Sequence, residues 1–470
     1  MSRGGFIFRA LNRGGYPHCG TYLCAPATGA DGTALFFSAS VPPFVCPHRI
    51  DGPSPRFRRA IQNELLARTA ASYTRNAPPA FLRPLFSARA APGPARFLRK
   101  ILPPISLFLR KLHIDINMST IVFTGGGTAG HVMPNLALLP YIEDKFDKIV
   151  YIGSEGGMEE SIVKRTKLRY YPVKTAKLQR KFTLKNLKIP IEVVKGYRQA
   201  KKILNELKPD LVFSKGGYVA VPVAFAARSL KIPVVTHESD LSAGLANKLI
   251  APRADKVLTA FPETAGQFAN GEYAGLPLSD DLFDTDKKTA LARYGFDGKK
   301  PVLLVLGGSQ GSRAINACLK DCLGDLLPKF DILHLYGRKN SPAANREGYR
   351  GLEFESEMRY AYAAADVAVS RAGAGTLFEL LSLKIPSVVV PLSKGVSRGD
   401  QIQNAEYFYA QGALTLVYEQ NLTPASLETA ISSTYADRFN FRRRLGRLRL
   451  ADANARIAQT ILSYRKTPQA

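Results

Sequence analysis

The segments of this sequence best suited to bind an anion are two glycine-rich loops, GGGTAGH at residues 125–131 and GGSQGS at 307–312. Each loop follows a short apolar run and precedes residues that favour a helix. Such a strand, glycine turn and helix N-terminus direct backbone N–H groups and a positive helix end at an anion, typically a phosphate. Two such units, each at the start of its own strand–helix series, predict two nucleotide-binding domains that face each other across a cleft.

The first loop also supplies a candidate general base. Gly125, Gly127 and Gly130 match the G-x-G-x-x-G pattern of dinucleotide sites, but the ribose-binding acid expected about 20 residues later is not clear, Glu155 being the nearest. His131 ends the loop, where a phosphate-binding turn requires no imidazole. A helix N-terminus keeps a histidine neutral, which is the state that a general base needs. The alternative is a histidine that caps the helix or packs against it.

The second loop matches the G-x-S-x-G pattern of a hydrolase nucleophile elbow at Gly307, Ser309 and Gly311. A hydrolase of that kind needs an acid and then a histidine further along the chain, and only His334 follows Ser309. This separation leaves no room for the later strands of a catalytic triad. Ser309 is therefore better interpreted as a hydroxyl and N–H donor to a phosphate.

A third segment, SRAGAGTLFE at 370–379, follows a predicted strand and begins a helix. Its small residues permit close approach of a ligand, Glu379 is suited to accept both hydroxyls of a ribose, and Arg371 is suited to a diphosphate. The alternative is a tight strand–helix packing turn. In a fourth segment, at 397–408, the amide of Gln401 is suited to sugar hydroxyls, although Asp400 is also a natural helix N-cap.

Two more segments, KGGYVAVP at 215–222 and HESDLSAGLANK at 237–248, begin at the carboxyl ends of predicted strands, where open α/β sheets bind ligands. His237 and Glu238 rival His131 for the role of base, or else form a core pair. An Asp-x-Asp pattern at 284–286 resembles that of metal-dependent sugar transferases, but its turn-rich surroundings indicate a solvated turn.

These segments require a scaffold of alternating strands and helices, and the sequence after residue 118 has that pattern. It predicts a doubly wound α/β fold in two halves, with a linker near 277–299. The strands expected in the first half are 120–125, 148–153, 211–216, 233–238 and 256–261, and those in the second are 301–306, 332–337, 352–356, 367–371, 387–392 and 414–418. Helices are expected between them, for example at 193–207 and 221–230.

The composition narrows the class of partner. The 470-residue chain carries a net charge of +27, which indicates a nucleic acid, an anionic membrane or a phosphorylated substrate. Five cysteines without a C-x-x-C pair argue against a disulfide scaffold, and Cys318 and Cys322 are expected to be buried thiols. The sequence shows neither an apolar run of the ~20 residues that a spanning helix needs nor a secretory signal.

Residues 1–117 differ from the rest, with 14 Arg and only 2 Lys against 4 acidic residues. The segment is rich in Pro, Ala and Gly and has little periodicity, so it buries too little to offset the entropy of ordering. We expect a disordered extension or a misassigned translation start, with the working protein beginning near Met118. An arginine-rich organelle-targeting segment is the alternative.

A basic stretch at 174–202 contains ten Lys or Arg residues and one acid, Glu192. Apolar residues lie between the charges, as in Lys181, Phe182 and Lys185. This mixture fits an anionic membrane surface better than a nucleic acid, because no nucleic-acid motif accompanies it. The alternative is a solvated helix face above core residues.

From Met118 to the end, the chain resembles the MurG-type N-acetylglucosamine transferases of glycosyltransferase family 28, which act in peptidoglycan synthesis. The motifs that carry the resemblance are GGTAGHVMP (126–134), KGGYVAVP, HESDLSAGLANK, GGSQGSRAIN (307–316), SRAGAGTLFE and GDQIQNA (399–405). The resemblance implies a GT-B fold, in which two Rossmann-like domains face a cleft and a C-terminal helix, here near 455–464, crosses back to the first domain. The implied boundaries are 118–278 for the acceptor and membrane domain, 279–440 for the UDP-sugar domain and 441–470 for the returning segment.

The family's activity is then the expected one: inverting transfer from UDP-N-acetylglucosamine to the C4 hydroxyl of undecaprenyl-diphosphoryl-muramoyl-peptide, without metal or cofactor and without nucleic acid. A peripheral position on the cytoplasmic face of the bacterial plasma membrane is implied as well. The implied catalytic residues are His131 and Glu238; the implied donor-site residues are Thr128, Ala129, Gly130, Asp240 (Asn in many relatives), Ser309, Gln310, Gly311, Arg371, Ala374, Gly375, Thr376, Leu377, Phe378, Glu379 and Gln401; the implied acceptor or membrane residues are Gly216, Gly217, Tyr218, Lys181, Phe182 and Lys185.

The sequence departs from the family pattern at one position. The family usually has an arginine two residues after the linker proline, whereas Pro277 is followed here by Leu278 and Ser279. Arg371 or another basic group would then serve the donor diphosphate. Other readings of the sequence are a UDP-sugar 2-epimerase, a glycosyltransferase with another lipid acceptor, an NAD-dependent oxidoreductase and a non-catalytic membrane or nucleic-acid adaptor.

Overall fold

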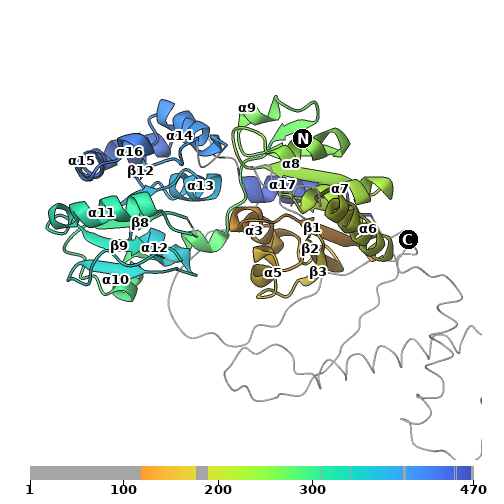
Figure 1. Ribbon diagram of the computed structural model, residues 1–470, viewed down its shortest axis with the longest axis horizontal. Coiled ribbons are helices and arrows are strands. Elements are labelled where there is room, and N and C mark those ends of the chain that lie inside the picture. The colour runs from red at the N-terminus through yellow and green to blue at the C-terminus, as the bar shows by residue number, and fades with distance from the viewer. Residues whose placement is uncertain are drawn as a thin grey trace, which may run out of the picture. The chain divides into compact units, whose positions relative to one another are not determined.

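The computed structural model describes residues 118–175, 189–308, 310–338, 340–394, 398–448, 450 and 452–466. These residues form two parallel β-sheets with helices on both faces of each (Figure 1). The expectations for residues 1–117 and for Lys181, Phe182, Lys185 and Ser309 lie outside the described residues.

The first sheet has seven strands in the order β3-β2-β1-β4-β5-β6-β7, all paired in parallel. Its central strands are short apolar runs whose residues are buried on both sides, as parallel sheets covered by helices require. The strands are β1 Thr120–Thr124, β2 Lys148–Ser154, β3 Arg169–Val173, β4 Leu211–Ser214, β5 Val234–Glu238, β6 Lys256–Thr259 and β7 Gly271–Tyr273.

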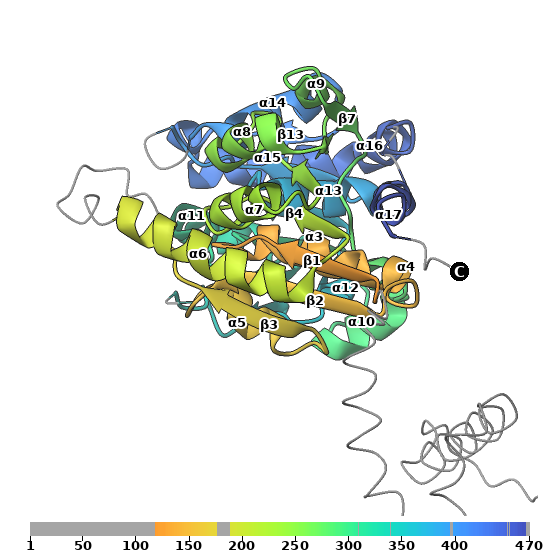
Figure 2. The ribbon, with the colours of Figure 1, turned by 90° about the vertical axis from the view of Figure 1, so that its right-hand side faces the viewer.

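Two helical layers cover this sheet (Figure 2). One core joins the sheet to α6 Ile189–Leu207, α7 Ala220–Ser229 and α8 Leu245–Ile250. The opposite core joins it to α3 Met133–Ala137, α4 Leu139–Ile142, α5 Met158–Val163 and α17 Ala453–Leu462. The remaining elements of this half are η3 Ala129–His131, η5 Ala251–Arg253 and α9 Pro262–Ala265.

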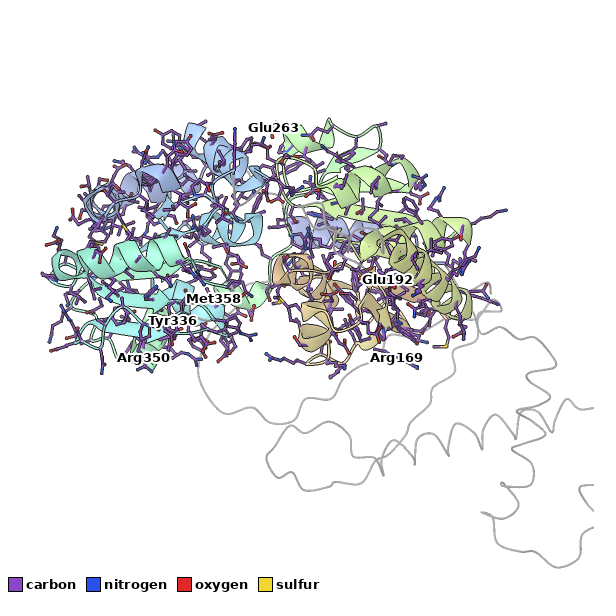
Figure 3. The ribbon with its side chains drawn as sticks, in the orientation of Figure 1. Arg169, Glu192, Glu263, Tyr336, Arg350 and Met358 are labelled. Carbon is purple, nitrogen blue, oxygen red and sulfur yellow. The ribbon has the colours of Figure 1, made fainter. Side chains whose placement is uncertain are left out.

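The second sheet repeats this topology in the order β10-β9-β8-β11-β12-β13. Tyr336, directly after β9, and Met358, the first residue of α12, stand on the carboxyl-end side of this sheet (Figure 3). Its strands are β8 Val302–Leu306, β9 Asp331–Leu335, β10 Tyr349–Leu352, β11 Val367–Ser370, β12 Ser387–Val389 and β13 Thr415–Leu416. Its helices are η6 Asp280–Phe283, α10 Lys287–Tyr294, α11 Arg313–Leu326, α12 Met358–Ala364, α13 Ala374–Ser382, α14 Asp400–Ala410, η7 Glu419–Asn421, α15 Pro424–Ala436 and α16 Arg438–Leu445.

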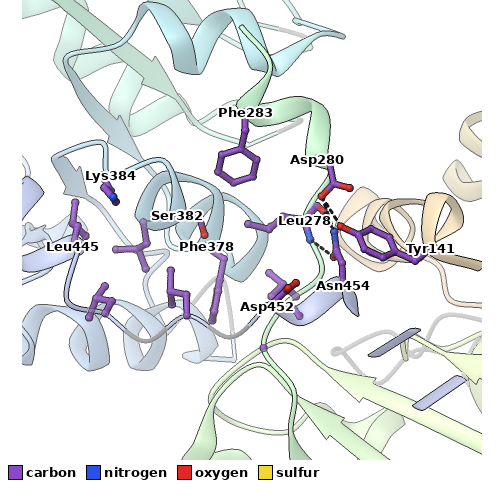
Figure 4. Close-up of a pocket in the computed structure, with 17 residues that line it drawn as sticks. Tyr141, Leu278, Asp280, Phe283, Phe378, Ser382, Lys384, Leu445, Asp452 and Asn454 are labelled. Carbon is purple, nitrogen blue, oxygen red and sulfur yellow. Dashed lines mark hydrogen bonds between the residues drawn. The ribbon is translucent and has the colours of Figure 1, made fainter. Parts of the chain in front are cut away.

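The last helix, α17, returns to the first domain, which confirms the expected crossing. Ile457 and Ile461 of α17 are fully buried in the core of the first sheet. At the start of α17, the amide of Asn454 bonds both the N–H of Leu278 at 3.2 Å and its carbonyl at 2.7 Å, and Tyr141 donates to Asp280 at 3.0 Å. These contacts line a cavity of about 360 Å³ where the two connections between the domains pass (Figure 4).

Three details differ from the sequence predictions. The strand expected at 352–356 lies instead at Tyr349–Leu352, and β3 and β7 had not been predicted. The last helix of the second half, α16, spans position 440, and its Leu445 packs in the core with α13 and α14.

Candidate functional site

The strand order creates one switch point in each domain. In the first sheet, β1 and β4 are neighbours whose connections leave in opposite directions, and β8 and β11 have the same relation in the second. Open α/β sheets bind ligands beyond the carboxyl ends of such strands. The loops predicted from sequence fall in pairs at these points: 125–131 and 215–219 after β1 and β4, and 307–312 and 371–374 after β8 and β11.

The first loop is held by a buried carboxylate that the sequence analysis did not identify. Glu159, in the first turn of α5, is fully buried. Its Oε2 accepts the N–H of Gly127 at 3.2 Å, and its Oε1 accepts the N–H of Ser154 at 2.9 Å and also the Ser154 hydroxyl. A Cβ at Gly126 would overlap this carboxylate. Glu159, rather than Glu155, is thus the acid associated with the first loop, and it binds the loop itself.

The loop after β4 packs directly against the first loop. Gly216 and Gly217 have φ of +80° and +82°, a conformation that favours glycine. A Cβ at Gly217 would overlap the carbonyl oxygen of Gly126. The ring of Tyr218 lies 2.8 Å from where a Cβ at Gly127 would be. Gly217 and Tyr218, which were implied for the acceptor, therefore also fix the shape of the first loop, whereas Gly216 packs against Asn247.

His131 closes the first loop and is only partly buried. Its Nδ1 lies 2.9 Å from the hydroxyl of Thr128, the extended residue that precedes η3. Among the described residues, its Nε2 has no hydrogen-bond partner. Desolvation, reinforced by the positive charge of Lys215, lowers the pKa of His131 to about 4. The imidazole is therefore neutral at pH 7, with one nitrogen available to accept a proton.

Beneath this loop lies a buried lysine, Lys215, which begins the KGGYVAVP segment but had been given no role of its own. Lys215 is 1% exposed, and its ammonium group bonds Nδ1 of His237 and, at 2.5 Å, the hydroxyl of Ser239. Nε2 of His237 lies 2.7 Å from the carbonyl oxygen of Gly275 and donates to it. Burial lowers the pKa of Lys215 to about 7, and burial together with Lys215 lowers the pKa of His237 far below its usual value. Both nitrogens of His237 are engaged.

Both carboxylate oxygens of Glu238 also accept hydrogen bonds from the protein. Its Oε1 accepts the N–H groups of Ser239 and Asp240 at 2.8 and 3.1 Å. Its Oε2 accepts the N–H of Gly244 at 2.8 Å and the amide of Asn247 at 2.9 Å. Four donors satisfy this carboxylate and shape the 239–244 turn. Of the three candidate bases, only His131 keeps an atom free for a substrate proton among the described residues.

In the second domain, backbone groups dominate the loop after β8. Gly308 and Gly311 have φ of +80° and +72°, and Gly311 donates to the carbonyl of Gly308 at 2.9 Å. The carbonyl of Gln310 accepts from Asn340 at 3.2 Å. Ser312 caps α11, its hydroxyl accepting from Ile315 at 3.3 Å. The loop therefore leads into a 14-residue helix whose N-terminus favours an anion.

The loop after β11 opens into α13, as the sequence predicts. A Cβ at Gly373 or Gly375 would meet no atom within 4 Å, so ligand atoms have room to approach the backbone. The side chains of Leu377 and Phe378 are 1% and 3% exposed and belong to a core. Ala374 is buried as well, and Gly375 and Thr376 are half-buried.

Glu379 lies one turn further along α13. Its Oε2 accepts the Tyr362 hydroxyl at 2.5 Å. Burial raises the pKa of Glu379 to about 7, and the nearby charge of Asp281 contributes to this shift.

The sequence suggested that Arg371 could contact a diphosphate, but in the structure its guanidinium is bonded within the second domain. Its Nη2 lies 2.5 Å from Glu419, and its Nη1 donates to the carbonyls of Val390 and Pro391 at 3.1 and 3.3 Å. Its side chain is 9% exposed. The charge of Arg371 is therefore neutralised inside the second domain, where Arg371 ties β11 to the end of β12.

The two domains meet through the turn after β5 and the start of α14. Asn404 donates to Asp240 at 3.0 Å and accepts the N–H of Leu241 at 2.9 Å. Desolvation and the charge of Glu238 raise the pKa of Asp240 to about 6. Gln401 bonds the N–H of Leu392 at 3.1 Å through its Oε1, which leaves its NH₂ group for other partners.

The structure thus brings Thr128, Ala129, Gly130 and His131 together with the 215–218 loop and Asp240, and places Gln310, Gly311 and Glu379 at the second switch point. Sequence reasoning missed Glu159, and it gave no individual role to Lys215 and Asn247, although both lie in quoted segments. A usable signal existed for Lys215, because a lysine directly after a fully apolar strand occupies a position that is normally buried. For Glu159 and Asn247 the contacts are tertiary, and no local pattern predicts them.

Comparisons with known proteins agree with this architecture. The family model "Glycosyltransferase family 28 N-terminal domain" matches residues 121–259, and "Glycosyltransferase family 28 C-terminal domain" matches 302–453. The UDP-N-acetylglucosamine–N-acetylmuramyl-(pentapeptide) pyrophosphoryl-undecaprenol N-acetylglucosamine transferase of Geobacillus kaustophilus is 45% identical over 339 residues, covering 71% of this chain and 95% of the relative. The enzyme of the same name from Clostridium botulinum is 41% identical over 355 residues, covering 74% and 100%.

Solved structures show the same fold. The crystal structure of Acinetobacter baumannii MurG covers 73% of this chain and 98% of its own, with a TM-score of 0.55 and 25% identity. The calicheamicin glycosyltransferase CalG4, at 16% identity and a TM-score of 0.56, shares the fold alone. The fold is therefore GT-B, and with both family models matched in order over more than half of its length, the chain belongs to glycosyltransferase family 28.

Proposed function

We propose that this protein transfers N-acetylglucosamine from UDP-N-acetylglucosamine to the C4 hydroxyl of undecaprenyl-diphosphoryl-N-acetylmuramoyl-peptide, with inversion. This step supplies the lipid-linked precursor of peptidoglycan, on which cell shape and division depend. The names of the curated relatives support this substrate pair. The observation that carries the proposal is the neutral imidazole of His131, with a free nitrogen, on the first of two switch points whose domains are in contact.

The reaction is a single displacement. The acceptor oxygen forms a bond to the anomeric carbon as the bond from that carbon to the β-phosphate oxygen breaks, and UDP leaves with the electron pair. Nε2 of His131 accepts the hydroxyl proton, a role that contributes about 10²–10⁴-fold to rate. Free backbone N–H groups at the N-terminus of α11 stabilise the charge that gathers on the departing diphosphate.

The low pKa of His131 suits this role once the donor is bound. Burial and Lys215 hold the imidazole neutral in the free protein, so Nε2 is ready to accept. A diphosphate brought to this side of the loop adds negative charge, which raises the pKa of the base toward neutrality. Its basicity would thus develop in the donor complex. Glu379 and Gln401 then serve the ribose and the sugar hydroxyls, as the family resemblance implies.

The proposal includes a peripheral position on the cytoplasmic face of the plasma membrane. Ile191 and Val194 on α6 are 56% and 48% exposed, and Leu245 and Leu249 on α8 are 58% and 45% exposed. Glu192, labelled in Figure 3, is paired with Lys195 at 3.0 Å, so the exposed start of α6 presents mainly apolar and basic groups. Such a surface binds anionic lipid, each basic residue contributing about 1 kcal/mol. Within the described residues, no helix combines the length and apolar character needed to cross a membrane.

The activity is tested by incubating the full-length chain in detergent with UDP-N-acetylglucosamine and EDTA, with and without the lipid-linked muramoyl-peptide. We expect UDP release only when the acceptor is present, and a disaccharide product with a β linkage. Equal UDP release without the acceptor would contradict the proposal and indicate a hydrolase. Conversion of the donor without release of UDP would indicate an epimerase.

The membrane part is tested separately by co-sedimentation with vesicles that contain phosphatidylglycerol. The double variant Ile191→Glu/Val194→Glu is expected to bind these vesicles less than the wild type, and neither protein should bind vesicles of phosphatidylcholine alone. Phe439→Glu, on the exposed face of α16 in the second domain, is the matched control, because Phe439 is 66% exposed. A larger loss with Phe439→Glu would place the membrane surface on the other domain.

A further inference from the structure

Arg398 is a half-exposed arginine between the two domains that the reaction described above does not use. It precedes α14, and its Nη2 lies 3.4 Å from Oδ2 of Asp240 in the first domain and 3.6 Å from Oδ2 of Asp400. Both distances exceed the roughly 2.7–2.9 Å of a well-formed charge-assisted hydrogen bond. The side chain of Arg398 keeps 44% of its surface exposed. The guanidinium is therefore loosely held and able to exchange partners.

The position of Arg398 is close to the reaction centre. Its Nη1 lies 3.3 Å from where a Cβ at Gly244 would be, within the turn that Glu238 organises. The charge of Arg398 also contributes to the low pKa of His131. The charged groups that face it are Asp240 from the first domain and Asp400 from the second. A cation from the second domain thus stands at the 239–244 turn of the first domain, near enough to His131 for its charge to act on the imidazole.

Arg371 provides the contrast. Three acceptors surround its guanidinium, the closest being Glu419 at 2.5 Å, and only 9% of the side chain is exposed. Moving Arg371 to a ligand would leave the carboxylate of Glu419 and two carbonyls without their donor, at a high cost. Moving Arg398 would break only long, half-solvated contacts, which contribute little.

We propose that Arg398 binds the diphosphate of the nucleotide-sugar donor, and that Asp240 competes with the diphosphate for this arginine. The inference rests on the proposed function and extends it. In the free protein the guanidinium is shared between Asp240 and Asp400. When the donor binds, the guanidinium turns to the phosphate oxygens, where its planar set of N–H donors forms a stronger, bidentate pair. Asp240 then lowers donor affinity, because its pairing with Arg398 must be broken first.

The experiment is calorimetric titration of the full-length chain with UDP and with uridine, which has the base and ribose but no phosphate. Arg398→Gln should weaken UDP binding about 10- to 100-fold and change uridine binding less than about twofold. Asp240→Asn should strengthen UDP binding about two- to fivefold and leave uridine unchanged. Arg443→Gln, an arginine of α16 bonded to Asn440, is the control and should alter neither. Uridine binding also reports whether each variant is folded.

The double variant Arg398→Gln/Asp240→Asn tests the competition. If Asp240 acts through Arg398, the gain from Asp240→Asn should vanish in the absence of the arginine. An undiminished gain would show that Asp240 repels the diphosphate directly, which overturns the competition. Equal losses of UDP and uridine binding in Arg398→Gln, or no loss of UDP binding, would overturn the role of Arg398. A wild-type chain that binds uridine and UDP but releases no UDP from UDP-N-acetylglucosamine in the presence of the acceptor would instead contradict the proposed function.

Discussion

The two switch points share one topology, but side chains shape the loop at the first and backbone groups shape the loop at the second. At the first, buried polar and charged side chains enclose the loop: Glu159 holds Gly127, Lys215 lies below Gly125, and Tyr218 covers the turn. At the second, the loop is fixed mainly by backbone contacts, and Gly308, Gly373 and Gly375 face open space. The first arrangement aims one side chain, His131, whereas the second exposes N–H groups and a helix end.

This difference matches the two tasks of the proposed reaction, which are proton transfer and diphosphate binding. Proton transfer needs an imidazole held in one orientation and one protonation state, which calls for a rigid and strongly polar surrounding. Binding a diphosphate needs backbone donors with room for the ligand, which small residues provide. A symmetric pair of domains therefore becomes asymmetric through the side chains that follow their strands, and each difference is open to experiment.

The largest effect is expected from His131→Ala. Removing the proposed base should lower kcat about 10²–10⁴-fold while UDP affinity stays within about twofold, because the charge stabilisation of the second loop is untouched. Thr128→Val, which removes only the hydroxyl beside Nδ1, should lower kcat about 10-fold. Steady-state kinetics with the lipid acceptor and UDP titration measure both. Normal turnover in His131→Ala would assign the proton transfer to another group. The first switch point would then not be the one that positions the base.

A smaller effect is expected on the free energy of unfolding when alanine replaces a glycine of each loop. Gly217 and Gly308 have φ of +82° and +80°, so alanine at either should cost about 1–2 kcal/mol of backbone strain. Gly217→Ala would in addition drive a Cβ into the carbonyl of Gly126, whereas Gly308→Ala meets nothing within 4 Å. Urea unfolding should therefore show a clearly larger loss of unfolding free energy for Gly217→Ala. Equal losses would mean that the first loop is no more tightly packed than the second.

The sequence predicted the central strands of both sheets because apolar runs of five or six residues end at glycine loops. The returning helix was implied only by the family resemblance. The misses lie at the edges, where strands are exposed and their periodicity is weak. β3 contains Pro172, which an edge strand tolerates, and β7 has only the residues GEY. The strand expected at 352–356 fell on the apolar LEF, but only Leu352 is paired, and Phe354 is 52% exposed.

At the site, the sequence predicted which loops follow the central strands, but not which of their side chains are already hydrogen-bonded within the protein. Arg371 and Glu238 looked like functional groups because of their types and places in motifs. Their occupation by Glu419 and by the 239–244 turn depends on contacts between distant segments. Arg398 escaped notice for the same reason: its neighbour Asp240 is 158 residues away in the chain.

The smallest predicted effect concerns the ribose side of the second switch point. Burial raises the pKa of Glu379 to about 7, while Tyr362 donates to its carboxylate. If the ionised carboxylate accepts the ribose hydroxyls, uridine affinity should rise about tenfold from pH 6 to pH 8, as the competent fraction grows. Uridine is the suitable probe because it carries no phosphate that titrates in this range.

The same group should affect stability with the opposite sign. Because the pKa of Glu379 is higher in the folded than in the unfolded chain, the folded state binds the proton more tightly. Its contribution to the unfolding free energy is fully present below about pH 4 and is lost as pH rises through about 7. Glu379→Gln should flatten both profiles, whereas 2′-deoxyuridine should show a weaker pH dependence with the wild type. A tenfold rise that persists in Glu379→Gln would show that another group controls nucleoside binding, the nearest in pKa being Lys215 at about 7 and Asp240 at about 6. Control would then lie at the first switch point rather than the second, and the assignment of nucleoside binding to the second switch point would be wrong.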